Sequence, residues 1–336
     1  MLDRELVHKR HAENVFVGVP VRCGQREFSS PAEFPCSHCL YNDTPGGLSG
    51  AGYLIEVARQ SNLAICHMFY DVPLDSGFLV AALDWCFSKP RPFVVEELEA
   101  FEVRTEIVEA VIRKGVLAKV STESRFFDSY GVEFLAGKAS FLITSRKLTT
   151  RGARPEPVAL GQMPMAPDRV MVTRPYNVFV GEPNRPADGT TETNPLIIDV
   201  THPYFFEHEN AHVPGMMLLE AGKQAAVFAA PRRFPIIGDC YGDLCRGEIR
   251  FTRFAELHRP VSIACAFGSL HESADGFQAP VNIMFEQAGR EIGRIQGDIA
   301  FVDQADAVTL SALRRQQLDS ALSQVSGDVP MSWAFE

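Results

Sequence analysis

Two long apolar segments occur in the chain, and each precedes stretches in which apolar and polar residues alternate. The apolar segments, residues 50–68 and 214–229, predict helices. Pro214 suits a first helical turn, because the N–H that proline lacks would have no intrahelical partner there. The alternating residues 101–107 and 261–267 predict strands with one buried face. One apolar helix among several half-buried antiparallel strands predicts an α+β fold in which a sheet wraps around the helix.

An internal repeat relates the two parts of the chain. NVFVGVP at residues 14–20 recurs as NVFVGEP at residues 177–183, with one difference in seven positions. YLIEVARQS around Glu56 corresponds to MLLEAGKQA around Glu220, and a slip of a single position brings the two pairs of segments to a common offset. A period of nearly half the chain is far too long for a solenoid unit, so each copy is expected to be a domain with its own core.

The repeat also predicts how the chain divides into domains. We expect an N-terminal domain over residues 1–150, a linker over 151–168, a C-terminal domain over 169–304, and an exposed helix and tail over 305–336. Prolines and glycines around the linker suit an extended connection across the surface.

The composition is that of an ordinary globular protein, with 46% hydrophobic and 22% charged residues. A formal net charge of −10 argues against nucleic-acid binding, which normally needs a basic excess or a basic stripe. No apolar run approaches the ~20 residues that span a bilayer, and the charged N-terminus is not typical of a secretory signal. We therefore expect a cytoplasmic protein that binds neither nucleic acid nor membrane. An acidic partner could dock only on a local basic patch, for which Arg232 and Arg233 are candidates.

The eight cysteines are expected to be buried free thiols, because nothing at the N-terminus indicates secretion. Cys36 and Cys39 have the CxxC spacing of zinc ligands, but a structural zinc site needs a second such pair. Cys240 and Cys245 are spaced too widely to supply it, so no metal is predicted.

Each predicted helix carries a glutamate followed by a cation and a glutamine at the same spacing: Glu56, Arg59 and Gln60 in the first, and Glu220, Lys223 and Gln224 in the second. A carboxylate in a nearly apolar helix is costly to desolvate unless it is paired. One explanation is a structural i,i+3 ion pair. The other is a general base with a raised pKa, beside a cation that orients an anionic substrate. Both explanations remain open from the residues alone, although recurrence in both copies favours function.

Histidines and a glycine precede the second helix. HPYFFEHENAHVPG contains His202, His208 and His212 in what reads as a loop, and no HExxH pattern accompanies them. A catalytic or positioning histidine is therefore favoured over a zinc ligand, and His38 precedes Glu56 by the same interval by which His202 precedes Glu220. Gly215 follows Pro214 at the helix start, where free N–H groups can stabilise an oxyanion. The glycine could equally mark only a flexible turn.

The stretch HPYFFEHENAHVPGMMLLEAGKQA resembles the signature of the A-factor biosynthesis family. VHKRHAENVFV near the N-terminus and HCLYNDTPGGLSGAGYLIEVARQSNLAICHMFYDVP in the first half resemble it too, so the similarity extends from about Val7 to Val302. The resemblance implies two tandem hotdog domains, each a long helix wrapped by an antiparallel sheet, that form an internal pseudo-dimer. A monomer or a homodimer is therefore expected, because one chain already contains both halves.

The family implies an acyltransferase of γ-butyrolactone or butenolide signal synthesis. The expected reaction moves a β-ketoacyl group from an acyl carrier protein thioester to the hydroxyl of dihydroxyacetone phosphate, and no cofactor is expected. Lys223 stands where the family pattern has arginine, which leaves the identity of the acceptor open. Hotdog dehydratases also have a Pro-Gly shortly before an acid, as Pro214 precedes Glu220, but their catalytic histidine has no clear counterpart.

The resulting hypothesis gives a role to each candidate residue. Glu220, with Glu56 across the internal interface, would take the hydroxyl proton, and N–H groups near Gly215 would hold the oxyanion. Lys223 or Arg59 would bind the phosphate. The remaining predicted substrate-binding residues are His202, His38, Gln224 and Gln60. Two alternatives remain: a hotdog dehydratase or thioesterase that acts on acyl thioesters, and a non-catalytic module that binds an acyl chain or carrier protein.

Overall fold

A computed structural model describes residues 2–35, 37–44, 48–89, 93–94, 100–145, 162–184, 192–207, 210–238, 240–273 and 276–303. The predicted helix and tail over 305–336 and most of the predicted linker over 151–168 lie outside these residues. The domain boundaries placed there remain predictions.

Both predicted long helices are present, and they occupy equivalent places in the repeat. Helix α1 spans Ala51–Phe69 and helix α3 spans Gly215–Arg233. Pro214 is the N-cap of α3 rather than a residue of its first turn, and its carbonyl accepts the N–H of Met217 at 3.0 Å. Each helix is buried along most of its length, which explains why its sequence is apolar on nearly every side.

The strands follow the helices in chain order. The described strands of the N-terminal half are β1 (Val21–Arg22), β2 (Glu27–Ala32), β3 (Leu48–Ser49), β4 (Ser76–Phe87), β5 (Phe93–Val94), β6 (Phe101–Arg113), β7 (Val116–Asp128) and β8 (Glu133–Ser145). Those of the C-terminal half are β9 (Thr193–Pro195), β10 (Cys240–Phe251), β11 (Val261–Phe267), β12 (His271–Ser273), β13 (Gly276–Gln287) and β14 (Arg290–Asp303). Short 3-10 turns occur at Arg4–Val7, Ala12–Asn14, Pro167–Val170, Pro175–Asn177 and Pro235–Ile237. The predicted alternation is confirmed over residues 101–107 of β6, where Phe101, Val103 and Ile107 are buried and Arg104 and Glu106 are exposed. Beyond it, Val108 and Ile112 are exposed.

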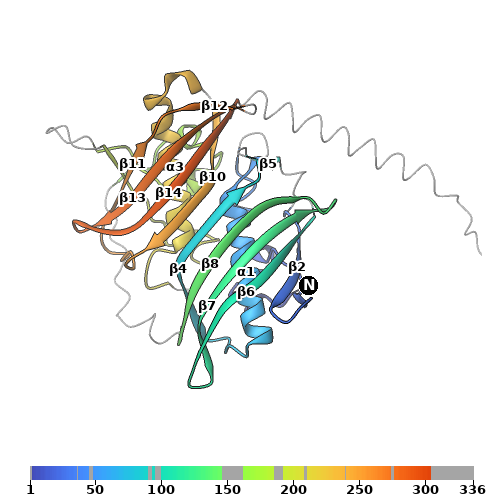
Figure 1. The fold of residues 1–336 in the computed structure, drawn as a ribbon. Helices are drawn as coiled ribbons and strands as arrows, with labels where there is room; N and C mark the ends of the chain where they lie inside the picture. Colours follow the sequence, from blue (N-terminus) through green and yellow to red (C-terminus); the bar gives the residue numbers. More distant parts are fainter. Residues whose placement is uncertain are drawn as a thin grey trace, which may run out of the picture.

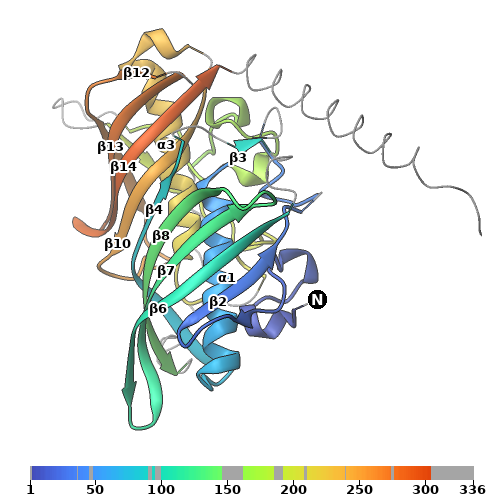
Figure 2. The same cartoon turned by 45° about the vertical axis from the view of Figure 1, so that its right-hand side comes forward.

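The strands of both halves join into one antiparallel sheet. Among the described residues its order is β1-β2-β6-β7-β8-β4-β10-β14-β13-β11-β9, with β12 paired to β13, while β3 and β5 form a separate pair. The halves meet where β4 pairs with β10, from Arg246 opposite Cys86 to Arg250 opposite Ala82. Both helices lie on the same side of this continuous sheet (Figures 1 and 2). The fold is therefore two helix-and-sheet units joined edge to edge.

A tryptophan stabilises the junction between β4 and β10. Trp85 is buried, and its indole N–H donates to the carbonyl of Leu244 at 3.0 Å. A Cβ on Gly247 would lie 2.4 Å from the Trp85 ring, so the indole packs directly against the backbone of the partner strand. Only a residue without a side chain fits at that position.

Each half also binds the N-terminal segment of the other through one buried carboxylate. Glu207 accepts hydrogen bonds of 3.0–3.2 Å from the amides of Arg10 and His11 and from Asn14 Nδ2. In the symmetric arrangement, Asp43 accepts bonds of 2.7–3.2 Å from the amides of Thr173 and Arg174 and from Asn177 Nδ2. The two carboxylates occupy equivalent positions of the repeat, since Asp43 is separated from Glu207 by the same interval as Glu56 from Glu220. Each unit therefore completes its polar interior with backbone from the other.

Replacing Asp43 with Ala should destabilise the whole chain. The substitution leaves several buried donors without an acceptor, and each such donor costs about 1–3 kcal/mol. We expect denaturant unfolding to show a loss of at least about 3 kcal/mol in unfolding free energy. The control is Glu109→Ala, which removes an exposed carboxylate that pairs with Lys119, and should change stability by less than about 1 kcal/mol. Equal losses in the two variants would contradict the role of Asp43.

Candidate functional site

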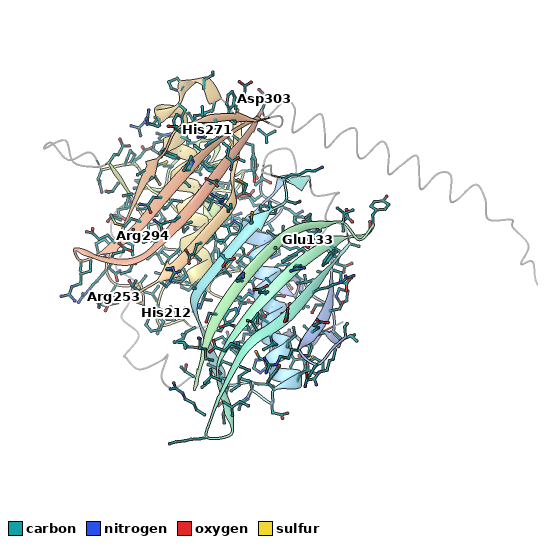
Figure 3. All side chains as sticks on the ribbon, viewed as in Figure 1. Glu133, His212, Arg253, His271, Arg294 and Asp303 are labelled. Carbon is teal, nitrogen blue, oxygen red and sulfur yellow. The ribbon has the colours of Figure 1, made fainter. Side chains whose placement is uncertain are left out.

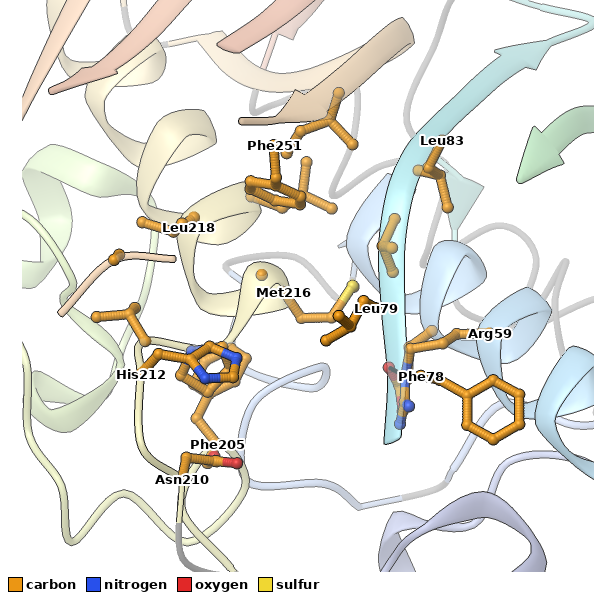
Figure 4. A pocket seen from close by; sticks show the side chains of 18 of the residues that line it. Arg59, Phe78, Leu79, Leu83, Phe205, Asn210, His212, Met216, Leu218 and Phe251 are labelled. Carbon is orange, nitrogen blue, oxygen red and sulfur yellow. Dashed lines mark hydrogen bonds and ion pairs between the residues drawn. The ribbon is translucent and has the colours of Figure 1, made fainter. Parts of the chain in front are cut away.

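A cavity of about 250 Å³ lies at the junction of the two halves. Its walls come from the middle of α1, from β4, from the first turn of α3 with the loop before it, and from the end of β10. Most of the lining is apolar, with Leu79, Met216 and Phe251 among the side chains that face the space (Figure 4). Its polar groups include a charged cluster on α1, the α3 N-terminus, Asn210 and His212 in the preceding loop, and Arg253 just beyond the end of β10.

The charged cluster is centred on Glu56, whose side chain is 1% exposed. Arg59 donates to it twice, from Nε at 2.7 Å and from Nη2 at 2.8 Å. Gln60 Nε2 adds a third bond at 3.0 Å, and Lys9 Nζ lies 3.3 Å from Oε1. Burial alone would raise the pKa of Glu56, but the charges of Arg59 and Lys9 outweigh it and hold the pKa well below its usual range. Glu56 is therefore a fixed anion, as in the structural ion pair, and the alternative hypothesis of a general base with a raised pKa does not fit this residue.

Lys9 brings the N-terminal segment to the cavity. Besides Glu56, its Nζ lies 3.3 Å from Glu207 Oε1 and 3.9 Å above the ring centre of Tyr204. The lysine thus links the first half to the loop of the second half. Sequence reasoning did not single it out, because it occurs in a short charged segment without helical or strand periodicity.

The first turn of α3 presents backbone N–H groups to the cavity. Pro214, Gly215 and Met216 all line it, and the first N–H groups of a helix have no intrahelical acceptor. A Cβ on Gly215 would lie 3.1 Å from the ring of Phe251. The glycine therefore allows close packing here, and it leaves the helix N-terminus accessible to a polar ligand.

His212 lies in the loop immediately before α3. Its ring packs against Phe254, with the ring centres 4.5 Å apart. Burial lowers the pKa of His212, so the imidazole is neutral near pH 7. In Figure 4 the imidazole and the Arg59 side chain stand on opposite sides of the cavity. A neutral histidine can act as a general base, and a free helix N-terminus can stabilise an oxyanion. Together they provide groups that acyl transfer needs.

The second glutamate cluster repeats the first within the other helix. Lys223 Nζ lies 2.9 Å from Glu220 Oε1, and Gln224 Nε2 donates to the same oxygen at 3.2 Å. Desolvation would lower the pKa of Lys223, but the charge of Glu220 outweighs it and raises the pKa. None of these three residues lines the cavity described above.

Asp243 closes the place that would correspond to the cavity in this second copy. It is buried, and its Oδ2 accepts the N–H of Ala51 at 3.2 Å, at the N-terminus of α1. A Cβ on Gly50 would lie 1.4 Å from that oxygen, so the carboxylate occupies the space next to the helix end. In the open copy the residue at the equivalent position of the repeat is Leu79. The repeat therefore has one open helix N-terminus and one that is already occupied by the carboxyl group of Asp243.

The predicted histidines and glutamines connect backbone segments away from the cavity. His38 Nδ1 accepts the amide of Leu40 at 3.1 Å, and its Nε2 is 2.9 Å from Asn14 Oδ1. Burial is the main cause that lowers the pKa of His38 to about 3. His202 makes the equivalent contacts, with Tyr204 N at 3.2 Å and Asn177 Oδ1 at 2.9 Å, and burial lowers its pKa to about 4.

The two glutamines have matching roles in this framework. Gln60 Oε1 accepts the amide of Phe16 at 2.8 Å, and its Nε2 donates to the carbonyl of Asn14 at 2.7 Å. Gln224 makes the same pair of bonds with Phe179 and Asn177, at 2.8 and 2.7 Å. Of the residues predicted from the sequence, the structure thus brings Glu56, Arg59 and Gly215 together at the cavity, whereas the other candidates lie elsewhere.

Other features of the described part of the chain bear on the remaining predictions. No group of three or more metal-ligating side chains occurs within it, and Cys36 and His208 lie outside it. Arg232, proposed as part of a basic patch, pairs with Glu192 and lies 5.1 Å from the ring centre of Phe228. Among the described helices, none has the length and apolar character needed to span a membrane.

The helices, the continuous sheet and the cavity at their junction define a double hotdog protein. The family model for the A-factor biosynthesis hotdog domain matches residues 1–129 and 158–303, so the chain belongs to that family. A protein from Lactobacillus plantarum described as a candidate oleoyl thioesterase has the same fold, with a TM-score of 0.50 and 13% identity over 83% of this chain and 98% of its own. The predicted family and fold are confirmed.

Two curated Streptomyces proteins are similar over most of their length. The 2-oxo-3-(phosphooxy)propyl 3-oxoalkanoate synthase of Streptomyces coelicolor is 29% identical over 263 residues, which are 76% of this chain and 78% of that protein. The synthase of the same name from Streptomyces griseus is 25% identical over 297 residues, 86% of this chain and 92% of its own.

The buried histidines should make the fold sensitive to mild acid. His38 and His202 stay neutral when folded and take up protons near pH 6.5 only when unfolded, so stability is lost as pH falls below about 6.5. The wild type and His38→Gln should differ in unfolding free energy, and this difference should shrink by about 1.4 kcal/mol per pH unit as the pH falls from 6 to 4. Denaturant unfolding at several pH values measures this slope, with the exposed His11→Gln as control. An unchanged slope in His38→Gln would argue against a neutral buried imidazole.

Proposed function

We propose that this chain is an acyltransferase that moves a β-ketoacyl group from a carrier-protein thioester to the hydroxyl of dihydroxyacetone phosphate. The observation that carries the proposal is the open cavity, where an apolar wall, a free helix N-terminus and a neutral histidine meet. Thioester attack by an alcohol needs these three components: a place for the acyl chain, donors for the oxyanion, and a base.

The names of the relatives support the choice of substrates. A 2-oxo-3-(phosphooxy)propyl 3-oxoalkanoate is the ester of a β-keto acid with dihydroxyacetone phosphate, and the Streptomyces proteins are named as synthases of it. The product would be a precursor of γ-butyrolactone or butenolide signals. An acyl carrier protein as donor, a monomer or a homodimer, and a cytoplasmic location belong to the same proposal.

A direct transfer mechanism follows from the positions of the groups. His212 removes the proton from the acceptor hydroxyl as its oxygen attacks the thioester carbonyl. The amides of Gly215 and Met216 stabilise the oxyanion, and collapse of the intermediate breaks the carbon–sulfur bond. The proton held on His212 then passes to the departing thiolate, so that an ester and a free carrier thiol leave the site. Glu56 orients Arg59 and Lys9 along one wall and does not itself titrate near neutral pH.

Hydrolysis is the second candidate, because water in place of the acceptor would turn the same site into a thioesterase. The common fold with the Lactobacillus plantarum protein is compatible with both reactions. The deciding experiment incubates purified protein with a β-ketoacyl carrier-protein thioester and dihydroxyacetone phosphate, and identifies products by mass spectrometry. A phosphorylated β-keto ester supports transfer, while free acid, an enoyl thioester or an untouched bound thioester would each overturn it.

Substitution of His212 by Gln should remove most of the activity without unfolding the protein. Loss of a general base lowers kcat by about 10²- to 10⁴-fold. Steady-state ester formation measures the effect, and thermal unfolding checks that the fold is retained. His271→Gln, in the exposed strand β12, is the matched control and should keep wild-type kcat. A His212→Gln enzyme within threefold of the wild type would exclude this residue as the base.

The two glutamates can be separated by parallel substitutions. Glu56→Gln releases Arg59 and Lys9 from their positions beside the cavity, and misplacement of this kind costs about 100-fold in rate. Glu220→Gln alters only the closed copy, so we expect kcat to stay within about threefold of the wild type. The opposite ranking, measured by the same product assay on folded variants, would assign catalysis to the copy that contains Glu220.

A further inference from the structure

Three cationic side chains line the open cavity, and two of them are already bound to carboxylates of this chain. Arg59 uses Nε and Nη2 for Glu56, while Lys9 lies between Glu56 and Glu207 at 3.3 Å from each. In Arg59 the pairing with Glu56 uses Nε and Nη2, and the carboxylate neutralises most of the charge that would attract a phosphate. Neither side chain is therefore a good anchor for a phosphorylated substrate, although Arg59 was a candidate for that role.

The third cation is Arg253, just beyond the end of β10. It is exposed, and among the residues that the structure describes it has no acidic partner. Its backbone is fixed, because its amide and that of Thr252 both donate to the carbonyl of Ile292, at 3.2 and 2.9 Å. The side chain thus starts from a rigid sheet end, and Arg253 lines the same cavity as His212 (both residues are labelled in Figure 3).

Arg253 differs in this respect from its neighbours on the sheet. Arg250 pairs with Glu248, Arg246 pairs with Asp298, and Arg294 pairs with Glu291, so the charges on these strands are largely neutralised. In a chain with a net charge of −10, an uncompensated guanidinium beside a cavity is a local point of attraction for anions.

We propose that Arg253 binds the phosphate group of a substrate at the mouth of the cavity. The inference deepens the proposed function, on which it rests for the reaction. Arginine offers a planar pair of donors that matches two phosphate oxygens, and the exposed position lets the phosphate keep part of its hydration. The reacting end of the substrate then points inward, toward His212 and the α3 N-terminus, while the phosphate remains at the rim.

Two substrate phosphates could occupy this position, and kinetics separates them. One is the phosphate of the acceptor, and the other is the phosphodiester of the carrier's pantetheine arm. The kinetic constants of Arg253→Ala, Arg253→Lys and the control Arg294→Ala are measured with two acceptors, dihydroxyacetone phosphate and unphosphorylated dihydroxyacetone. The same variants are then measured with two acyl donors, the carrier-protein thioester and an N-acetylcysteamine thioester, which lacks the phosphodiester.

If Arg253 binds the acceptor, Arg253→Ala raises the KM for dihydroxyacetone phosphate about 10- to 100-fold while kcat changes less than threefold. The preference for the phosphorylated acceptor falls by the same factor, and Arg253→Lys recovers part of it. If Arg253 binds the pantetheine arm, the KM rise appears only with the carrier-protein thioester. Wild-type behaviour of Arg253→Ala with all four compounds would overturn the proposal.

Failure of the proposed function can be distinguished from failure of this inference by direct binding. Calorimetric titration with dihydroxyacetone phosphate and with the phosphopantetheine needs no turnover. Binding by the wild type and by Arg294→Ala, with a loss of at least tenfold in Arg253→Ala, supports the anchor even if no ester forms. Equal affinity of wild type and Arg253→Ala for both compounds overturns it, whatever reaction the enzyme performs.

Discussion

Two buried carboxylates, one in each half, bind the N-terminal segment of the opposite half, and the rest of the structure depends on this reciprocal contact. Glu207 holds the segment around Asn14, and Asp43 holds the segment around Asn177. Each asparagine in turn contacts the histidine and the glutamine of its own half, and so fixes the N-terminal segment of that half against the central helix. Because the same reciprocal contact brings Lys9 to Glu56, the polar wall of the cavity forms only when both halves are folded together.

On this symmetric framework the site itself is asymmetric. A single strand position decides the difference: Leu79 leaves the N-terminus of α3 open to the cavity, whereas Asp243 occupies the N-terminus of α1. The carboxyl group of Asp243 accepts an N–H at the N-terminus of α1, and burial raises its pKa against the opposing charge of Lys223. In the closed copy a side chain of the protein therefore occupies the helix N-terminus, whereas the open copy leaves its helix N-terminus free for a substrate.

The main elements of the fold could be predicted from the sequence because they leave periodic traces. Apolar helices, alternating strands and a long internal repeat are visible without a structure, and they predict two copies of one helix-and-sheet domain. The pseudo-dimer was implied by the resemblance to the A-factor biosynthesis family. The site was only partly predictable. The repeat shows that Glu56 and Glu220 are equivalent, but which copy is open depends on contacts between β10 and the start of α1, which are far apart in the sequence. Lys9 and Arg253 lie in segments without a recognisable sequence pattern, and only the folding of the chain brings them to the cavity.

The closure of one copy by Asp243 has a consequence for stoichiometry. A homodimer of single hotdog domains must present two identical sites, since any substitution appears in both subunits. Joining the two domains in one polypeptide removes that constraint, so that one copy can specialise in structure while the other specialises in chemistry. If the open cavity is the site, we expect one equivalent of substrate per polypeptide and a turnover without communication between twin sites.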